Sequence, residues 1–506
     1  MLLPWSDHLP PGHPVGPDLV VPWDNLLRAW SAQWEARPRA RLWLDATGAD
    51  GPTRWWTAGE FDAATRTVAG RLHRAGLVPG DRVVWSTPSS VPALAAHVGA
   101  LRAGLVVVPC NPAYSRRELS HIVADVRPAA AVVGRSDQAR WIREAATGPV
   151  VTVGTDVDLP DGEPDVLDAA APDDAALICF TSGTTSAPKG AVLRHANLVA
   201  ATESVRLAWR WTPDDRLVHC LPVFHAHGLC VGVYGTLSAG GSAVLLAGFD
   251  PDGVVEAAGD PAASLLFGVP TMYHRLVASG RAGELAPLRL CVSGSAALPA
   301  GLHAAASAAI GSTVLERYGM TETLMNVSNP YDGERRPGTV GFPLPGVEVR
   351  RGAGDEIEVR GPNVFGGYWE RPAADADAFV PADDGGRAWF RTGDVGGEDR
   401  GYLVIRGRTK ELIITGGMNV FPGEVEDVLA THPAVAEVAV TGTPSEEWGE
   451  VVTAYVVAEG RAPGLAELAR HCAGALAPYK RPRRLVVVDE LPRNDLGKVV
   501  RSRLGG

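Results

Sequence analysis

Cysteine is scarce in this sequence. Only six cysteines occur among 506 residues, they are widely scattered, and none forms a CxxC pair. Such a distribution does not support a disulfide framework, and several of the cysteines lie in apolar runs. We therefore expect unpaired, buried thiols in a protein of the reducing cytoplasm: Cys110, Cys179, Cys220, Cys230, Cys291 and Cys472.

An excess of positive charge is also missing. The 58 acidic residues outnumber the 47 lysines and arginines, which gives a formal net charge of −11. Without a global positive field, we do not expect the protein to bind nucleic acid or an anionic membrane surface. A ligand that carries phosphate must instead be held by local groups.

Long apolar segments are absent as well. A membrane-spanning helix needs about 20 uninterrupted apolar residues. The nearest approach, residues 229–247, is interrupted by Tyr234, Thr236 and Ser238. The N-terminal MLLPWSDHLPPGHP has no basic leader before an apolar stretch, and prolines break it. We therefore expect neither a signal peptide nor an integral membrane segment.

The residues that are present have the balance of an ordinary globular protein, with 46% hydrophobic and 21% charged residues. The length suggests several packed units. Short β-branched runs such as RVVWS and LVVVP alternate with helical stretches such as VPALAAHVGALRAG and RRELSHIVADV. This rhythm is typical of βαβ units, so we predict an α/β fold with mostly parallel sheets covered by helices.

The pattern changes twice toward the C-terminus. From about residue 338 to 407, short strands alternate with Gly, Pro and Asp turns, which predicts a β subdomain. After Arg408, new strands and helices are numerous enough for a separate small α+β domain. We predict a large N-terminal domain over residues 1–409, a C-terminal domain over 410–506 and a hinge at Lys410.

The first motif with chemical content is FTSGTTSAPKG at residues 180–190. Hydroxyls, small residues and backbone N–H groups that follow an apolar strand can form a nest for phosphate oxygens, and the lysine adds a mobile charge. A flexible turn is the plain alternative. A P-loop is rejected because Lys189 precedes Gly190 and Ala191 and not Ser or Thr. The candidate phosphate-binding residues are Thr181, Ser182, Gly183, Thr184, Thr185 and Lys189.

Two further clusters fit a nucleotide. An aromatic ring can stack on adenine, a small-residue turn can contact its edge, and a carboxylate near phosphates can hold Mg²⁺. Singly, such a segment is more often a packed turn. The candidates lie in CVSGSAA and ERYGMTE: Gly294, Ser295, Ala296, Glu316, Tyr318, Gly319, Met320, Thr321 and Glu322.

Two shorter motifs follow. Asp394 in WFRTGD, with Arg408 shortly after it, supplies a carboxylate that can accept two hydrogen bonds from a ribose diol. Lys498 in LPRNDLGK lies on a glycine-containing turn and can reach into a cleft as a point charge. Taken alone, each of these residues is more often a solvated surface group.

These motifs, together with GRTKELIITGGMNVFPGEVE at 407–426, make the chain resemble the superfamily of adenylate-forming enzymes from about residue 55 to its end. That superfamily includes acyl-CoA synthetases, firefly luciferase and the adenylation domains of peptide synthetases. The resemblance implies an ATP-dependent acid:CoA ligase that makes an acyl-adenylate and then a thioester. It also implies a C-terminal domain that rotates between the two half-reactions.

The resemblance assigns roles to matching positions. Residues 181–189 would bind the β- and γ-phosphates, and Glu322 with Thr185 would organise Mg²⁺. Tyr318 would flank adenine, and Asp394 and Arg408 would hold the ribose. Lys498 would bridge the carboxylate and the α-phosphate. The hinge would be Lys410, and the loop of Gly416 and Gly417 would line the pantetheine tunnel of CoA.

One position departs from the family pattern. Residue 186 is serine where the family usually has glycine, and a positive φ there would cost on the order of 1 kcal/mol. We expect ATP still to bind. An enzyme specialised for the thioester half-reaction stays open as an alternative.

The acid is expected near FHAHG at 224–228 and FGVPTMYHR at 267–275, with His225 as a gate or pocket residue. The run ERYGMTETLMNVSNPYDGERRPGTVG at 316–341 and the phrase FGVPTMYHRL at 267–276 look closest to the malonyl-CoA synthetase branch, in which arginines at the positions of Arg275 and Arg317 would hold a distal carboxylate. Ala226 replaces a bulkier residue of that branch. A medium-chain, long-chain or polycyclic acid of secondary metabolism is therefore the alternative substrate.

Other classes of function also stay open. A catalytically impaired homologue would bind nucleotide without releasing pyrophosphate, and a luciferase-like oxygenase would consume O₂ after adenylation. A carrier-protein adenylation domain is a further alternative. We expect free CoA as the acceptor because no carrier sequence follows Gly506.

Overall fold

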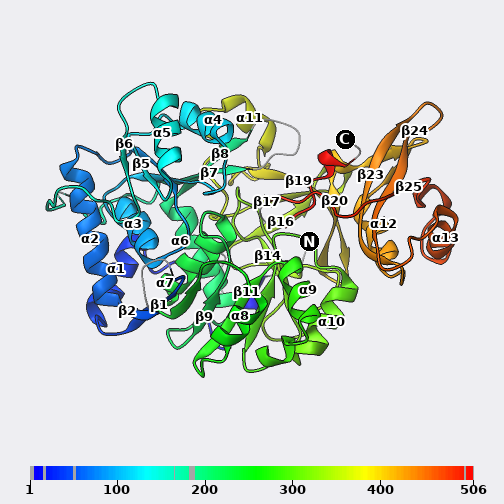
Figure 1. Cartoon of the computed structure of the whole chain (residues 1–506), viewed down its shortest axis with the longest axis horizontal. Helices are drawn as coiled ribbons and strands as arrows, with labels where there is room; N and C mark the ends of the chain where they lie inside the picture. Colours follow the sequence, from blue (N-terminus) through cyan, green and yellow to red (C-terminus); the bar gives the residue numbers. More distant parts are fainter. Residues whose placement is uncertain are drawn as a thin grey trace.

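The computed structural model describes residues 5–14, 19–48, 53–164, 166–181, 188–494 and 497–504. Two large, mostly parallel sheets form the body of the molecule, and two smaller sheets follow toward the C-terminus (Figure 1). The predicted α/β fold is therefore confirmed. Of the helices in the described ranges, none is long and apolar enough to cross a membrane.

The first large sheet has nine strands in the order β15-β14-β13-β12-β11-β9-β10-β1-β2. Its central strands are parallel, and β2, β14 and β15 are antiparallel to their neighbours. The strands are β1 (Arg41–Ala46), β2 (Arg54–Thr57), β9 (Arg216–His219), β10 (Ser242–Leu246), β11 (Ala263–Gly268), β12 (Leu290–Ser293), β13 (Leu315–Tyr318), β14 (Val327–Ser328) and β15 (Phe342–Pro343).

The second large sheet has six strands in the order β6-β5-β3-β4-β7-β8, parallel except for the β7–β8 hairpin. The runs that predicted βαβ units form its strands and helices, because a buried parallel strand is recognisable from its continuous β-branched residues. The strands are β3 (Arg82–Ser86), β4 (Val106–Pro109), β5 (Ala130–Val133), β6 (Val151–Val153), β7 (Ala175–Thr181) and β8 (Lys189–Arg194).

Helices flank these sheets, and side chains cap the N-terminal ends of α1, α2, α3, α4 and α8. Thr57 and Ser115 each form a capping box with a glutamate three residues later. The helices are α1 (Leu26–Ala36), α2 (Ala58–Arg74), α3 (Val91–Arg102), α4 (Arg116–Val126), α5 (Ser136–Ala145), α6 (His195–Ala208), the π-helix η2 (His227–Val233), α7 (Tyr234–Ala239), α8 (Pro251–Ala258), α9 (Pro270–Ala278) and α10 (Ala300–Ile310).

Helix α3 is central to the core. All of its residues except Pro92 are buried, which agrees with a helix that is apolar on every side. Its last residue, Arg102, is 1% exposed and is paired with both Asp62 and Asp168 at 2.6 and 2.9 Å. A buried arginine is tolerated here because two carboxylates neutralise it.

The third sheet is antiparallel and lies where the β subdomain was predicted. Its order is β16-β17-β19-β18, with β20 paired to β19. The strands are β16 (Glu348–Arg351), β17 (Glu356–Arg360), β18 (Phe379–Val380), β19 (Trp389–Asp399) and β20 (Tyr402–Arg408), with helix α11 (Pro372–Ala378) before β18.

The fourth sheet and two helices form the C-terminal part, drawn in orange and red at one end of the longest axis (Figure 1). They are β21 (Ile413–Thr415), β22 (Met418–Val420), α12 (Pro422–Leu429), β23 (Val435–Ser445), β24 (Gly449–Ala458), α13 (Leu465–His471) and β25 (Arg484–Val487). A short 3₁₀ turn, Thr409–Glu411, joins β20 to β21 and contains Lys410. The domain boundary and the hinge at Lys410 stay predictions.

Candidate active site

A cavity of about 500 Å³ lies at the carboxyl ends of the parallel strands and is lined by both large sheets and the C-terminal tail. Such strand ends are where open α/β sheets usually bind ligands. The first wall comes from the loops after β3 and β4, the second from the loops after β9 and β10 and from α9. The lining includes Thr87, Pro88, Asn111, Leu221, Phe224, His225, His227, Phe249, Met272, Arg275, Ser295 and Gly497.

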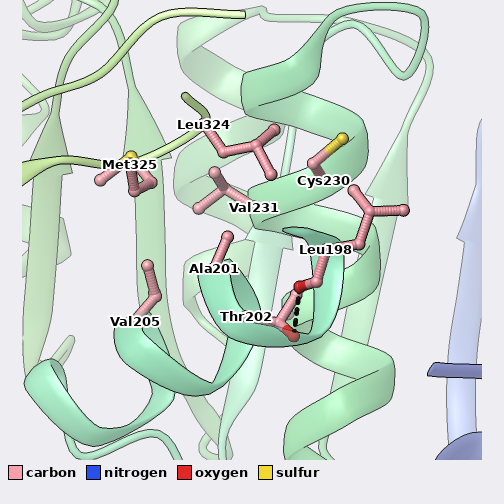
Figure 2. A pocket seen from close by; sticks show the side chains of 9 residues that line it. Leu198, Ala201, Thr202, Val205, Cys230, Val231, Leu324 and Met325 are labelled. Carbon is pink, nitrogen blue, oxygen red and sulfur yellow. Dashed lines mark hydrogen bonds between the residues drawn. The ribbon is translucent and has the colours of Figure 1, made fainter. Parts of the chain in front are cut away.

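A second, much smaller cavity does not qualify as a site. It measures about 10 Å³ and lies between α6, the π-helix and residues 324–325, surrounded by apolar side chains (Figure 2). The Thr202 hydroxyl in its wall already donates to the Leu198 carbonyl at 2.9 Å. A cavity of this size without a free polar partner is a packing gap.

Three of the predicted nucleotide-binding residues are joined by hydrogen bonds to the carboxylate of one of them. Asp394 is buried on β19, where it accepts hydrogen bonds from the Tyr318 hydroxyl at 2.6 Å and from Arg408 Nε at 3.1 Å. Burial raises the pKa of Asp394, while Arg408 and the tyrosine hydroxyl oppose that shift. The three side chains come from β13, β19 and β20, and this preorganised carboxylate suits the ribose diol that the sequence predicts.

The turn after β12 is tightly constrained. A Cβ at Gly294 would lie 2.3 Å from Arg317 Nε, so a larger residue would have to displace that guanidinium. Ser295 follows in the left-handed region at φ 67°, an unusual conformation for serine that is often found at functional sites. Its hydroxyl lies 3.1 Å from Nδ1 of His227, a buried residue that the sequence interpretation did not select. Ala296 is exposed.

Arg317 is the most unusual charge of the site. It is only 5% exposed, and among the described residues its Nε and Nη2 atoms have no hydrogen-bond partner. Burial lowers its pKa to about 9. Its charge also acts on Lys498 and His225, so these three groups are neighbours. A buried cation without a partner carries a large desolvation cost, which indicates a place for an anionic ligand.

The tail carries Lys498 into this cleft. The Lys498 N–H donates to Asn494 Oδ1 at 3.0 Å, and its carbonyl accepts from the Asn494 N–H at 2.9 Å. Gly497 has φ 73°, and a Cβ there would lie 2.9 Å from Thr271 Oγ1, so the tail packs closely against α9. Burial and the charges of Arg408 and Arg317 lower the pKa of Lys498 to about 8.

This pKa gives a testable pH dependence. Since the predicted role of Lys498 requires its charged form, we expect kcat/KM for adenylation to fall about tenfold per pH unit above the pKa of about 8. The free energy of unfolding should change in the opposite direction. The pKa of Lys498 is lower in the folded than in the unfolded chain, so the unfolded chain binds more protons between pH 8 and the ordinary pKa of lysine. In this range the free energy of unfolding should therefore rise with pH. Pyrophosphate release and urea unfolding across this range, each compared with Lys498→Met, would show both trends; flat profiles would contradict the pKa.

The predicted metal and phosphate residues are partly described. Glu322 is 6% exposed, burial raises its pKa, and its Oε1 accepts the Tyr368 hydroxyl at 3.1 Å. Lys189 begins β8 opposite Thr181, whose hydroxyl donates to the Lys189 carbonyl. Ser182, Gly183, Thr184, Thr185 and Ser186 lie outside the described residues.

A carboxylate suits Mg²⁺, which prefers oxygen ligands and one or two carboxylates beside phosphate oxygens. Glu322 is buried, and no arginine or lysine in the described ranges forms a salt bridge with it. An acidic group that is buried without a paired cation fits a metal ion at this position. Glu322 would hold Mg²⁺ together with the phosphates.

The remaining nucleotide candidates shape the same region. Glu316 is buried, its Oε1 accepts the Leu298 N–H at 2.8 Å, and burial raises its pKa to about 8. Gly319 allows the chain to turn, since a Cβ would lie 2.0 Å from the Leu324 carbonyl. Met320 and Thr321 are half-buried at the same turn.

The acid-side candidates come from different elements. His225 lines the cavity, and burial with the charges of Lys498 and Arg317 lowers its pKa to about 3, so it is neutral. Arg275 reaches the cavity from α9 and is exposed, with its guanidinium 5.0 Å from the centre of the Phe249 ring. Arg317 lies beside the turn at Gly294, so a shared ligand of the two arginines stays a prediction.

The predicted pantetheine loop is a hairpin tip. Gly416 and Gly417 join β21 to β22 with φ 57° and 77°, which only glycine adopts readily. A Cβ at Gly416 would also lie 2.8 Å from the Trp448 ring. Their role in a tunnel stays a prediction.

Comparison with known proteins identifies the family of the chain. The model of the AMP-binding enzyme family matches residues 30–369, and that of the AMP-binding enzyme C-terminal domain matches 424–498. Mitochondrial malonate–CoA ligase ACSF3 of Mus musculus is 35% identical over 486 residues, covering 85% of this chain and 82% of the relative. A feruloyl-CoA synthase of Amycolatopsis sp is 34% identical over 492 residues, covering 93% and 97%.

Solved structures give the same result. ATP-bound MatB from Rhodopseudomonas palustris has a TM-score of 0.86 and 40% identity, covering 94% of this chain and 98% of that chain. A malonyl-CoA ligase in a ternary product complex with methylmalonyl-CoA and AMP has a TM-score of 0.64 and 41% identity, covering 90% and 97%. The chain belongs to the family of AMP-binding enzymes, which form acyl-adenylates.

Proposed function

We propose that the protein is an ATP-dependent acid:CoA ligase of the AMP-forming type. The observation that carries this proposal is the buried guanidinium of Arg317, whose Nε and Nη2 have no hydrogen-bond partner in the described part of the chain, beside Lys498 and in the same cleft as the Tyr318–Asp394–Arg408 cluster. Two cations there suit two anions, a carboxylate and the α-phosphate of ATP. The relatives named as CoA ligases support the same assignment.

The first step joins two negatively charged groups. A carboxylate oxygen of the acid forms a bond to the α-phosphorus, the bond to pyrophosphate breaks, and pyrophosphate leaves with its electron pair. The repulsion between the anions must be offset where charge accumulates, and Lys498 in a buried position offsets it most strongly. Mg²⁺ bound at Glu322 would neutralise phosphate charge.

The second step transfers the acyl group. The CoA thiol releases its proton to solvent and its sulfur bonds to the acyl carbonyl carbon, the bond from that carbon to the phosphate oxygen breaks, and AMP leaves with the electron pair. Lys498 has no role in this step, so the tail can move away after adenylation, as the predicted domain rotation requires. We place the enzyme in the reducing cytoplasm, since all six cysteines are buried and unpaired.

A small dicarboxylate of the malonate type is the proposed acid. The malonate–CoA ligases among the relatives support it, and the exposed guanidinium of Arg275 at the cavity supplies a cation for a distal carboxylate. A bulkier acid is the second candidate, favoured by a cavity of about 500 Å³, by the small Ala226 and by the feruloyl-CoA synthase relative.

Mass spectrometry of reactions with ATP, Mg²⁺ and a panel of acids, with and without CoA, tests this function. We expect acyl-AMP without CoA and acyl-CoA with it, and malonate should give the highest kcat/KM. Products from bulky aromatic acids alone would select the second candidate. Nucleotide binding without any acyl-AMP would show an impaired homologue, and O₂ consumption would show an oxygenase; either outcome would contradict a CoA ligase.

A further inference from the structure

Tyr368 lies between two charged groups of the proposed nucleotide site. Its hydroxyl donates to Glu322 Oε1 at 3.1 Å, and the ammonium of Lys189 lies 5.0 Å from the centre of its ring. The first contact is a hydrogen bond to a carboxylate and the second is a cation–π contact. One side chain therefore contacts both the predicted metal ligand and the predicted phosphate lysine.

The surrounding backbone fixes this tyrosine firmly. The segment from Gly366 to Trp369 pairs with β8, through bonds from Gly366 N–H to the Val192 carbonyl at 3.0 Å and from Trp369 N–H to the Gly190 carbonyl at 2.7 Å. The Tyr368 N–H donates to Asp375 Oδ1 at 2.7 Å. Because β8 begins with Lys189, this pairing sets the distance between the tyrosine ring and the lysine.

The same segment is also joined to Glu322. The Phe365 N–H donates to the Glu322 carbonyl at 2.8 Å, and the Phe365 ring packs edge-on against Tyr368 with centroids 4.9 Å apart. Both the backbone and the carboxylate of Glu322 are therefore held from residues 365–368.

The contacts of Tyr368 keep a carboxylate and an ammonium from pairing with each other. A buried carboxylate and a nearby ammonium attract each other strongly, and a direct pair would remove both charges from ligand binding. Among the salt bridges of the described residues, none joins Lys189 to Glu322. The ring face accepts the ammonium and the hydroxyl holds one carboxylate oxygen, so each charge keeps its own position.

We propose that Tyr368 is a positioning residue that keeps Glu322 and Lys189 apart and oriented for Mg²⁺ and phosphate. This inference rests on the proposed function, because it assumes that the cleft binds a magnesium nucleotide. Tyr368 itself takes no part in bond making.

The test measures binding of a non-hydrolysable ATP analogue by calorimetry, with Mg²⁺ and with EDTA, in the full-length protein. Tyr368→Phe removes only the hydroxyl, and we expect affinity with Mg²⁺ to fall about tenfold while affinity in EDTA is unchanged. Tyr368→Leu also removes the ring, which allows Lys189 to pair with Glu322, so affinity should fall under both conditions.

Tyr402→Phe is the matched control, because the Tyr402 hydroxyl donates to the Glu334 carbonyl at 2.9 Å, a contact outside this cluster. The Tyr402→Phe variant should lose about as much stability as Tyr368→Phe, and its affinity for the nucleotide should be unchanged. Equal affinities of the parent and Tyr368→Phe for the magnesium complex, or equal losses with Mg²⁺ and EDTA, would overturn the inference. A parent that binds the magnesium analogue and makes no acyl-AMP would overturn only the proposed function.

Discussion

Replacing Lys498 by alanine should lower the rate of adenylation by about 100- to 1,000-fold, because one preorganised cation is lost from a dry site where two anions react. The thioester half-reaction from supplied acyl-AMP should stay within about fivefold of the parent, since that step needs no cation between two anions. Single-turnover pyrophosphate release measures the first step, and acyl-CoA formation from synthetic acyl-AMP measures the second.

Lys480→Ala is the control for this experiment. Lys480, like Lys498, belongs to the C-terminal part of the chain, but its ammonium pairs with Glu424. Neither half-reaction should therefore change when Lys480 is replaced. An equal loss of both half-reactions in Lys498→Ala would mean that the lysine supports the fold of the tail and not the chemistry of adenylation.

Replacing Arg317 by methionine should have opposite effects on stability and activity. Methionine keeps the unbranched apolar stem of the side chain and removes a buried charge whose Nε and Nη2 atoms have no hydrogen-bond partner among the described residues, so the free energy of unfolding should rise by about 1 kcal/mol or more. The loss of a charged contact with the bound anion should lower kcat/KM for the acid by about 100-fold. Urea unfolding and steady-state kinetics measure the two effects.

The control variant is Arg102→Met, in the other buried arginine of the large domain. Arg102 is paired with both Asp62 and Asp168, so its removal leaves two half-buried carboxylates without this cation and should cost about 3 kcal/mol. Destabilisation of Arg317→Met to the same degree would show that Arg317 is a structural group, and the argument for an anion site beside Lys498 would fail.

Much of the fold could be predicted from local patterns. The strands β3 and β4 and the helices α3 and α4 were all expected from runs of β-branched residues and from helical stretches. This works because hydrophobic periodicity is a property of a few consecutive residues. The pairing of the strands was harder to predict from the sequence. For example, β9 pairs with β10 and β11, and this order depends on contacts between distant segments.

The candidate site, like the fold, could be predicted only in part. The motifs led to Tyr318, Asp394 and Arg408, and the structure brings these three side chains into hydrogen-bond contact. His227 lay in the segment predicted to be near the acid but was given no role of its own, and Tyr368 was missed, because a single histidine or tyrosine has no distinctive spacing in a sequence. Each becomes notable only through a partner far along the chain, Ser295 for the histidine and Glu322 for the tyrosine.

The sequence by itself determined the class of chemistry: a hydroxyl-rich loop, a ribose-type carboxylate and a terminal lysine occur in an order that resembles the adenylate-forming enzymes, and this resemblance implies adenylation. Only the tertiary structure decided which charges are buried, which of them have partners and where the cavity opens. The physical reason is that desolvation depends on what surrounds a group in space. For Arg317 and Lys498 those surroundings come from strands and a tail that lie far apart in the chain.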